Sequence, residues 1–230
     1  MKAYYDLSIK PATYDFVVFL VVAKTLGATE IVFDVSKGFQ KKKFSEGVGR
    51  RMYENILQPA CGLWGLPFSE GTEGDFTPGY RWNHLIDAYL EKGALAQPAC
   101  TKKGDARYTV TLRDSIRNKH RDSNRPAWER FAAEIGANII EDAYIKPILL
   151  EERFALYNGA EMNFFKSNGP AALPMCSQMP FTIFSPPCAD ETWPQPMRKG
   201  RQLPWANQNQ RIIWNDDTYE NIRAAHESMR

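Results

Sequence analysis

The chain has 230 residues, of which 43% are hydrophobic and 24% charged, values typical of a globular protein of one or two domains that folds without disulfides or metals. Its 29 basic and 27 acidic residues nearly cancel, which argues against general nucleic-acid binding. The four cysteines form no CxxC pair and the three histidines are scattered, so no metal site is predicted. With no signal-peptide pattern and no apolar run long enough for a membrane span, a cytoplasmic protein is expected.

The first 35 residues predict a βαβ unit. An apolar-aromatic run over residues 3–9 suits a buried strand, and Thr13 is a plausible N-cap for a helix over 14–26 that Gly27 closes. Residues 30–35 read as a second strand of nearly continuous apolar character. Strand, helix and strand joined by short links indicate a parallel sheet.

The next seventy residues are harder to assign. A helix over 49–57, ended by Pro59, and another over 83–91 are expected, whereas the Gly-, Pro- and aromatic-rich stretch 61–79 yields no assignment. Residues 97–105 have the composition of a linker.

Strand–helix alternation is much clearer after the linker. Strands are expected at 107–112, 138–142, 161–165, 180–184 and 211–214, and helices at about 125–135, 147–157, 169–177 and after the cap region 215–218. This order predicts a doubly wound α/β arrangement. The chain is therefore expected to be an α/β protein of two Rossmann-like lobes, residues 1–104 and 105–230, with the first lobe reduced.

Ligands of open parallel sheets bind where strand ends lead into helices. In the first such turn, Asp6 and Asp15 offer carboxylates for general-base work. The alternative is that Asp6 caps the strand end and that Asp15 is a first-turn acid favoured by the helix dipole. No GxGxxG motif is present, so a standard dinucleotide fingerprint is absent.

Three further places combine a strand end with ligand-binding chemistry. The loop 113–125 carries Arg113, Arg125 and four other basic residues before a helix N-terminus at Asn124, which suits a phosphate, although such loops are more often simply solvated. The small-residue turn formed by Asn168, Gly169, Pro170 and Ala171 lets a backbone approach a ligand closely, or is a plain tight turn. Glu151 or Glu152 could bind ribose hydroxyls, or form an exposed acidic pair.

The second half resembles the C-terminal, donor-binding lobe of GT-B glycosyltransferases, closest to the heptosyltransferase-like group. The resemblance covers roughly 120 residues and rests on the order of strands, a small-residue turn of the "NGP" type, a short helix and a further strand. The matching segments are YTVTLRDS at 108–115, SNRPAWERFA at 123–132, ILLEERFALYNGAEMNFFKSNGPAALPMCSQMPFTIF at 148–184 and WANQNQRIIWNDDTYENI at 205–222.

The resemblance implies a metal-independent transfer of a sugar from a nucleotide-sugar donor to a glycan or other hydroxyl acceptor, with no further cofactor. The donor diphosphate would lie against residues 168–171, with Arg113 as its cationic partner. The first turn of the N-terminal lobe, through Asp6 or Asp15, would supply the catalytic base. The family's aspartate in the small-residue turn is replaced here by Asn168, and a histidine that often follows this turn is absent.

Two other functions stay open at this stage. A binding or scaffold protein would keep the fold without the base, and the short first lobe favours this reading. A nucleotide-sugar epimerase of the same architecture would need several acids and a histidine around the cleft, and histidine is scarce. Peripheral contact with an anionic membrane surface through Lys37, the lysines at 41–43, Arg50 and Arg51 is a further option beside a solvated loop. No partner protein or oligomeric state is predicted.

Overall fold

The computed structural model describes residues 1–39, 45–114, 122–141, 148–185, 198 and 200–229. Its contacts divide the chain into two units, Met1–Thr101 with Leu149–Glu151, and Lys102–Ile148 with Glu152–Arg230. The sequence placed the boundary between 104 and 105, and the assignment of an acceptor lobe and a donor lobe stays a prediction. Each unit is an α/β structure built on a parallel sheet.

Unit 1 contains a three-stranded parallel sheet in the order β1-β2-β3. Its strands are β1 (Lys2–Asp6), β2 (Glu30–Asp34) and β3 (Phe68–Glu70), and its helical elements are α1 (Asp15–Thr25), α2 (Glu46–Met52), the π-helical turn η1 (Tyr53–Leu57), α3 (Gln58–Trp64) and α4 (Trp82–Lys92). The backbone at Phe76 pairs with β1 at Ala3, on the side away from β2. The predicted βαβ unit is therefore present, and the unassigned stretch 61–79 supplies the short strand β3.

The β1–α1 turn begins earlier than the apolar run 3–9 suggests. The Oδ1 atom of Asp6 accepts hydrogen bonds from the backbone N–H (2.8 Å) and the hydroxyl (2.6 Å) of Ser8, and this turn ends the strand at Asp6. The helix begins at Asp15, whose N–H donates to the Thr13 hydroxyl at 3.3 Å. Residues 16–23 of α1 are all buried, as expected for a helix that packs on a sheet.

The prediction that Pro59 ends a helix is wrong. Helical structure continues from Glu46 to Trp64 through α2, η1 and α3. A proline inside a helix lacks an N–H and its ring collides with the carbonyl four residues earlier. The wider π-helical turn that precedes Pro59 relieves this collision, because its hydrogen bonds span one more residue.

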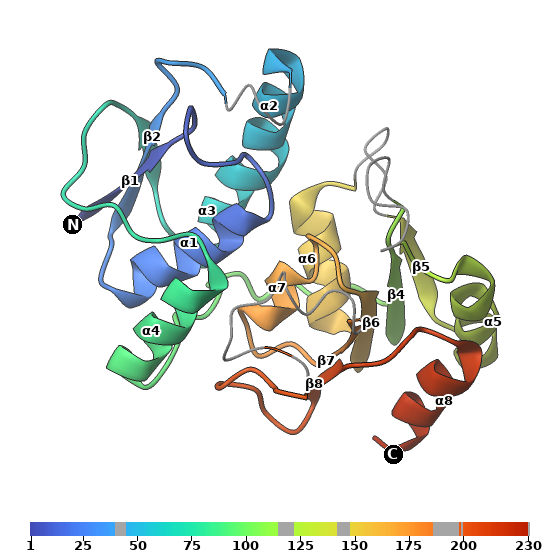
Figure 1. Ribbon diagram of the computed structural model, residues 1–230. Coiled ribbons are helices and arrows are strands. Elements are labelled where there is room, and N and C mark those ends of the chain that lie inside the picture. Colours follow the sequence, from blue (N-terminus) through green and yellow to red (C-terminus); the bar gives the residue numbers. More distant parts are fainter. Residues whose placement is uncertain (40–44, 115–121, 142–147, 186–197, 199, 230) are drawn as a thin grey trace. The chain divides into compact units, whose positions relative to one another are not determined.

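Unit 2 contains a five-stranded sheet in the order β5-β4-β6-β7-β8, parallel throughout (Figure 1). Its strands are β4 (Tyr108–Leu112), β5 (Asn138–Glu141), β6 (Met162–Lys166), β7 (Phe181–Phe184) and β8 (Gln210–Ile213), and its helices are α5 (Arg125–Ile135), α6 (Leu150–Gly159), α7 (Ala172–Met175) and α8 (Tyr219–Glu227). The first strand lies inside the sheet, with the second on one side and the third on the other. The predicted doubly wound arrangement is therefore observed for this half.

Alternate residues of the central strands face opposite layers. Val110 of β4 and Phe164 of β6 belong to a buried cluster with Trp128 of α5 and Ile222 of α8, so these two helices cover one face. Thr111, the next residue of β4, points to the opposite face, where its hydroxyl lies 2.8 Å from the Tyr157 hydroxyl of α6. Because side chains alternate along a strand, Lys166, the last residue of β6, points to the same side as Phe164, toward α5 and α8.

Two helices differ from the predicted bounds. The predicted helix 169–177 contracts to the four residues of α7. The structure starts α6 at Leu150, and the predicted start at 147 lies outside the described residues. Within the parts of the chain that the structure describes, no helix combines the length and apolarity of a membrane span.

Candidate functional site

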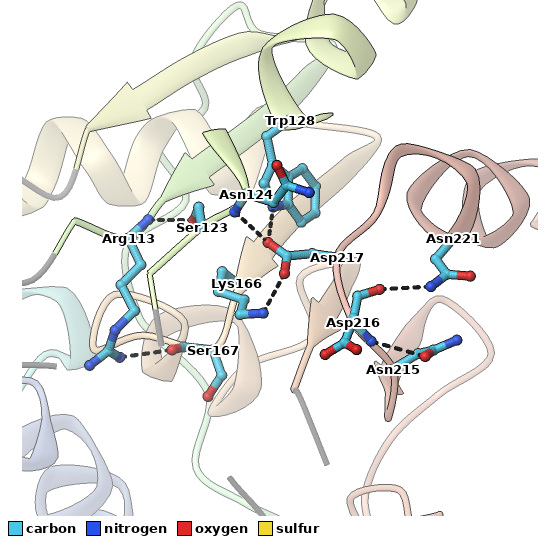
Figure 2. Close-up of polar contacts among 10 residues, drawn as sticks. All are labelled: Arg113, Ser123, Asn124, Trp128, Lys166, Ser167, Asn215, Asp216, Asp217 and Asn221. Atoms are coloured by element: carbon cyan, nitrogen blue, oxygen red, sulfur yellow. Dashed lines mark hydrogen bonds and ion pairs between the residues drawn. The ribbon is translucent and has the colours of Figure 1, made fainter. Parts of the chain in front are cut away.

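The strand order of unit 2 places the topological switch point between β4 and β6. In doubly wound sheets, ligands bind beyond the carboxyl ends of the two strands at which the winding direction reverses. Arg113 directly follows β4 and Ser167 directly follows β6. The Nη1 atom of Arg113 donates to the backbone carbonyl of Ser167 at 2.8 Å (Figure 2). A guanidinium group therefore bridges the two strand ends at the switch point.

Arg113 is also anchored through its backbone. Its N–H donates to the hydroxyl of Ser123 at 2.8 Å, and its carbonyl accepts the N–H of Ser123 at 2.9 Å. These reciprocal bonds close the base of the loop between β4 and α5. The predicted basic residues at 117, 119, 120 and 121 in that loop lie outside the described residues.

A buried ion pair lies at the end of β6, on the α5–α8 side of the sheet. The Nζ atom of Lys166, the last residue of β6, is 2.5 Å from Oδ1 of Asp217, which precedes α8. The Oδ2 atom of Asp217 accepts hydrogen bonds from the Asn124 N–H (2.8 Å) and from Nε1 of Trp128 (2.7 Å). Figure 2 shows this carboxylate between the three donors. One side chain thus joins β6, the start of α5 and the start of α8.

Asp217 remains ionised in this position. Burial by itself would raise the pKa of Asp217, but the hydrogen bonds from Lys166, Asn124 and Trp128 together hold that pKa below its usual range. The sequence reading of residues 216 and 217 as helix caps is therefore incomplete. The helix cap of α8 is Thr218, whose hydroxyl accepts from the N–H of Asn221 at 3.2 Å.

The hydrogen-bond donors at the start of α5 are already bound by carboxylates of the chain itself. Asp217 accepts the Asn124 N–H, and the guanidinium of Arg125 makes two bonds of 2.9 Å to Glu141 and one of 3.1 Å to Glu129. A ligand would have to displace these carboxylates. The ligand-binding role assigned to Asn124 and Arg125 from the sequence therefore stays a prediction that this geometry does not favour.

Donors without a partner gather instead at Arg113 and in the turn after β6. Among the described residues, the buried Nε of Arg113 and the buried Nδ2 of Asn168 have no hydrogen-bond acceptor. The Oδ1 atom of Asn168 accepts the N–H of Ala171 at 3.1 Å, which fixes the turn. Gly169 is exposed, and within the described chain its N–H makes no hydrogen bond. The structure thus brings Arg113 close to the turn 168–171, as the strand-end rule predicts.

Two carboxylates lie side by side at the corresponding edge of unit 1. Asp6 and Asp34 are paired in the register of β1 and β2, and each uses Oδ1 to accept from the N–H and hydroxyl of the serine two residues later. The Oδ2 atom of Asp34 also accepts the Tyr4 hydroxyl at 2.5 Å. The bonds from Ser36 and Tyr4 lower the pKa of Asp34, which makes it a poor base.

The carboxylates of Asp6 and Asp15 accept fewer hydrogen bonds than that of Asp34. The Oδ2 atom of Asp6 has a distant ionic partner, Nζ of Lys37 at 3.9 Å, and no hydrogen bond from a described residue. The carboxylate of Asp15, at the start of α1, has neither an ion pair nor a hydrogen bond in the described part of the chain. Sequence reasoning missed Asp34, although its D-x-S spacing repeats that of Asp6 and Ser8.

The remaining predicted residue, Glu151, is exposed in the first turn of α6. It groups with unit 1 rather than with unit 2, which contains Arg113 and the turn 168–171, and its role in binding ribose stays a prediction. Over the described ranges, no three histidine, cysteine, aspartate or glutamate side chains come together in a way that could hold a metal ion.

Comparison with known proteins leaves the family open. No protein-family model matches the chain, and no curated protein matches it. Among solved structures, the chain is similar to an iron-containing dodecameric glycosyltransferase, TibC, from enterotoxigenic E. coli H10407, with 11% sequence identity and a TM-score of 0.49 over 100% of this chain and 77% of that one. A likeness this slight assigns neither the fold nor the activity of this chain.

Proposed function

We propose that the protein transfers a sugar from a nucleotide-sugar donor to a hydroxyl group of a glycan or similar acceptor. Unit 2 would bind the donor at the switch point between β4 and β6. Unit 1 would supply the acceptor-side base, and the two units together would act as the lobes of a GT-B-like enzyme.

The partnerless donors at the switch point carry this proposal. A buried N–H without an acceptor costs about 1–3 kcal/mol, and such groups in native proteins usually have a functional or structural reason. Arg113 Nε and Asn168 Nδ2 are both in this state, and they lie at the edge where doubly wound sheets bind ligands. A diphosphate offers several acceptor oxygens and two negative charges, which match a guanidinium and nearby N–H groups.

The proposed chemistry follows from where these groups lie. Cleavage of the bond between sugar and diphosphate puts negative charge on the leaving phosphate. Arg113 would stabilise that charge, as a metal ion does in other transferases. The four-residue helix α7 adds little dipole, so the guanidinium and the N–H of Gly169 would do most of this work.

On the acceptor side, Asp6 or Asp15 would remove the hydroxyl proton. Asp6 is the better oriented of the two, because Ser8 fixes one of its oxygens and leaves Oδ2 to accept a proton. Asp34 is the weaker candidate because three donors already bind its carboxylate.

A thermal-shift screen tests the donor site. The ligands are UDP, GDP, ADP, CMP and their common sugar conjugates, and the proteins are the wild type, Arg113→Ala and the matched control Arg125→Ala. A ligand at about 100 times its Kd adds about 2.7 kcal/mol of stability, which raises the melting temperature by several degrees. Loss of a charged hydrogen bond of about 1.5–3 kcal/mol should weaken binding to Arg113→Ala by roughly 10- to 150-fold, whereas Arg125→Ala should bind like the wild type.

Product analysis after incubation with any sugar conjugate that raises the melting temperature separates the alternatives. Binding of a nucleoside diphosphate without sugar transfer would favour a binding or scaffold protein, and sugar interconversion on the intact donor would favour an epimerase. No shift with any nucleotide at millimolar concentration, or equal losses in both variants, would contradict the donor-site assignment.

A further inference from the structure

Lys10, in the turn between β1 and α1, is a buried cation. Only 7% of the residue is exposed. Its Nζ atom donates to the backbone carbonyls of Tyr4 (3.3 Å) and Pro78 (3.5 Å), and it lies 5.0 Å and 4.7 Å from the ring centroids of Tyr5 and Phe19. No carboxylate in the described part of unit 1 forms an ion pair with it.

A buried ammonium group without an ion pair needs a reason to be there, because leaving water costs several kcal/mol. The two carbonyl oxygens and the faces of two aromatic rings return part of that cost. Burial lowers the pKa of Lys10 to about 8, although the nearby charge of Asp6 opposes this shift. The cation is thus retained at neutral pH and lost in mildly alkaline solution.

Lys10 contacts the end of β1 at two points, Asp6 itself and Tyr4 two residues before it. Its backbone N–H donates to the carbonyl of Asp6 at 2.8 Å, and its Nζ reaches back to the carbonyl of Tyr4. The same Nζ contacts Pro78, in the segment whose Phe76 N–H and carbonyl groups pair along the outer side of β1. The ammonium therefore ties the turn that carries Asp6 to a second part of the chain.

We propose that Lys10 is a positioning residue for Asp6: its ammonium group, held by two carbonyls and two aromatic rings, keeps the β1–α1 turn in the shape that directs the Asp6 Oδ2 atom toward the acceptor. This inference rests on the proposed function, in which Asp6 is the base. When Lys10 loses its positive charge, its hydrogen bonds to the two carbonyls weaken and its attraction to the two aromatic rings is lost. The β1–α1 turn is then held less firmly.

The surroundings of Lys10 contain few groups that titrate in the same range. Asp6 is the charged group that acts on it directly. Burial raises the pKa of Tyr5 well above its usual value, with smaller contributions from Asp15 on α1 and Tyr80 beyond the Pro78 contact. Tyr5 therefore stays neutral where Lys10 loses its proton, and a transition near pH 8 reports Lys10.

The kinetic test measures release of nucleoside diphosphate from the sugar conjugate that gives the largest thermal shift, with water or an added sugar as acceptor. For Lys10→Met we expect kcat at pH 7 to fall about 10- to 100-fold, the loss that a misplaced catalytic group produces, with the donor KM unchanged. For the wild type we expect kcat to fall above pH 8 as Lys10 loses its charge. Lys10→Arg keeps its charge at high pH, so this fall should be absent. Lys2→Met is the matched control, since Lys2 lies on β1, the strand that Lys10 contacts, but is exposed and pairs with Glu30.

A spectroscopic test needs no turnover. In the wild type, the amide resonances of Ser8 and Lys10 should titrate together with a midpoint near pH 8, and in Lys10→Arg this transition should be absent. A kcat of Lys10→Met within twofold of wild type, or the absence of the amide transition, would overturn the inference. If the wild type releases no diphosphate from any conjugate, the proposed function fails, and the amide titration alone decides whether Lys10 controls the turn.

Discussion

The buried pair of Lys166 and Asp217 should show strong energetic coupling. Their side chains are 5% and 7% exposed, and removal of one member of a buried pair typically costs about 3–5 kcal/mol because the other charge is left alone. The methionine variant Lys166→Met leaves Asp217 with two N–H donors, from Asn124 and Trp128, so we expect about 3 kcal/mol. For Asp217→Asn we expect about 5 kcal/mol, since Lys166 then has no carboxylate partner within the described residues.

The double variant Lys166→Met/Asp217→Asn should be more stable than either single variant. Its asparagine can still accept from Asn124 and Trp128, and no charge remains buried, so we expect a loss of only about 1–2 kcal/mol. Hydrogen exchange of β4 and β6 amides gives the free energy of unfolding of unit 2. Amides of α1, in unit 1, serve as an internal control and should keep their protection.

The pH dependence of the same exchange gives a second check. Because the folded-state pKa of Asp217 is lowered from its ordinary 3.8, its contribution is fully present above that value and is lost as the pH falls below it. The double variant should lack this acid-dependent part. A loss below 1 kcal/mol in Asp217→Asn, or additive losses in the double variant, would refute the account of the pair.

Two further predictions concern backbone conformation and thiol reactivity. Gly136 ends α5 with φ 67°, and Gly62 lies inside α3; an added Cβ would meet open space at both positions. Gly136→Ala should therefore lower the free energy of unfolding by about 1–2 kcal/mol, because its backbone is left-handed. Gly62→Ala should raise that free energy by about 0.5–1 kcal/mol, and urea unfolding measures both changes. Burial raises the pKa of Cys61 and of Cys176 well above the ordinary value, so neither thiol should react with a thiol reagent at pH 8 until the protein unfolds. Peptide mapping identifies the labelled cysteines, and rapid labelling of either one in the folded protein would contradict its buried position.

The sequence predicts most of the elements because their ends carry strong local signals. Gly93 and Gly136 close α4 and α5 in the left-handed conformation, which an isolated glycine after a helical pattern indicates. β3 was missed since its three residues, between Pro67 and Gly71, are too few to show a period. The path through Pro59 could not be foreseen, because a π-helical turn has no clear signature in the sequence.

The candidate site is predictable only in part. The strand-end rule brings Arg113 and the turn 168–171 together without knowledge of contacts. The partner of Lys166 lies 51 residues further along the chain, and no local pattern points to it. The sequence does hold one signal. Lys166 lies on the same buried face of its strand as Met162 and Phe164, and a lysine buried there needs a carboxylate to pair with its charge. The pairing of Arg125 with Glu141 on β5 likewise depends on packing, whereas its pairing with Glu129, four residues later on the same helix, follows from local spacing.

In the proposed function, a nucleoside diphosphate binds between the ends of β4 and β6. The most direct test maps ¹⁵N chemical shifts during titration with the nucleotide that stabilises the protein most. We expect the Arg113 side-chain Nε–H signal to move strongly as it gains an acceptor, together with the backbone signals of Asn168 and Gly169. Saturable shifts confined to other residues, with the Arg113 Nε–H signal unmoved, would show that the nucleotide binds elsewhere.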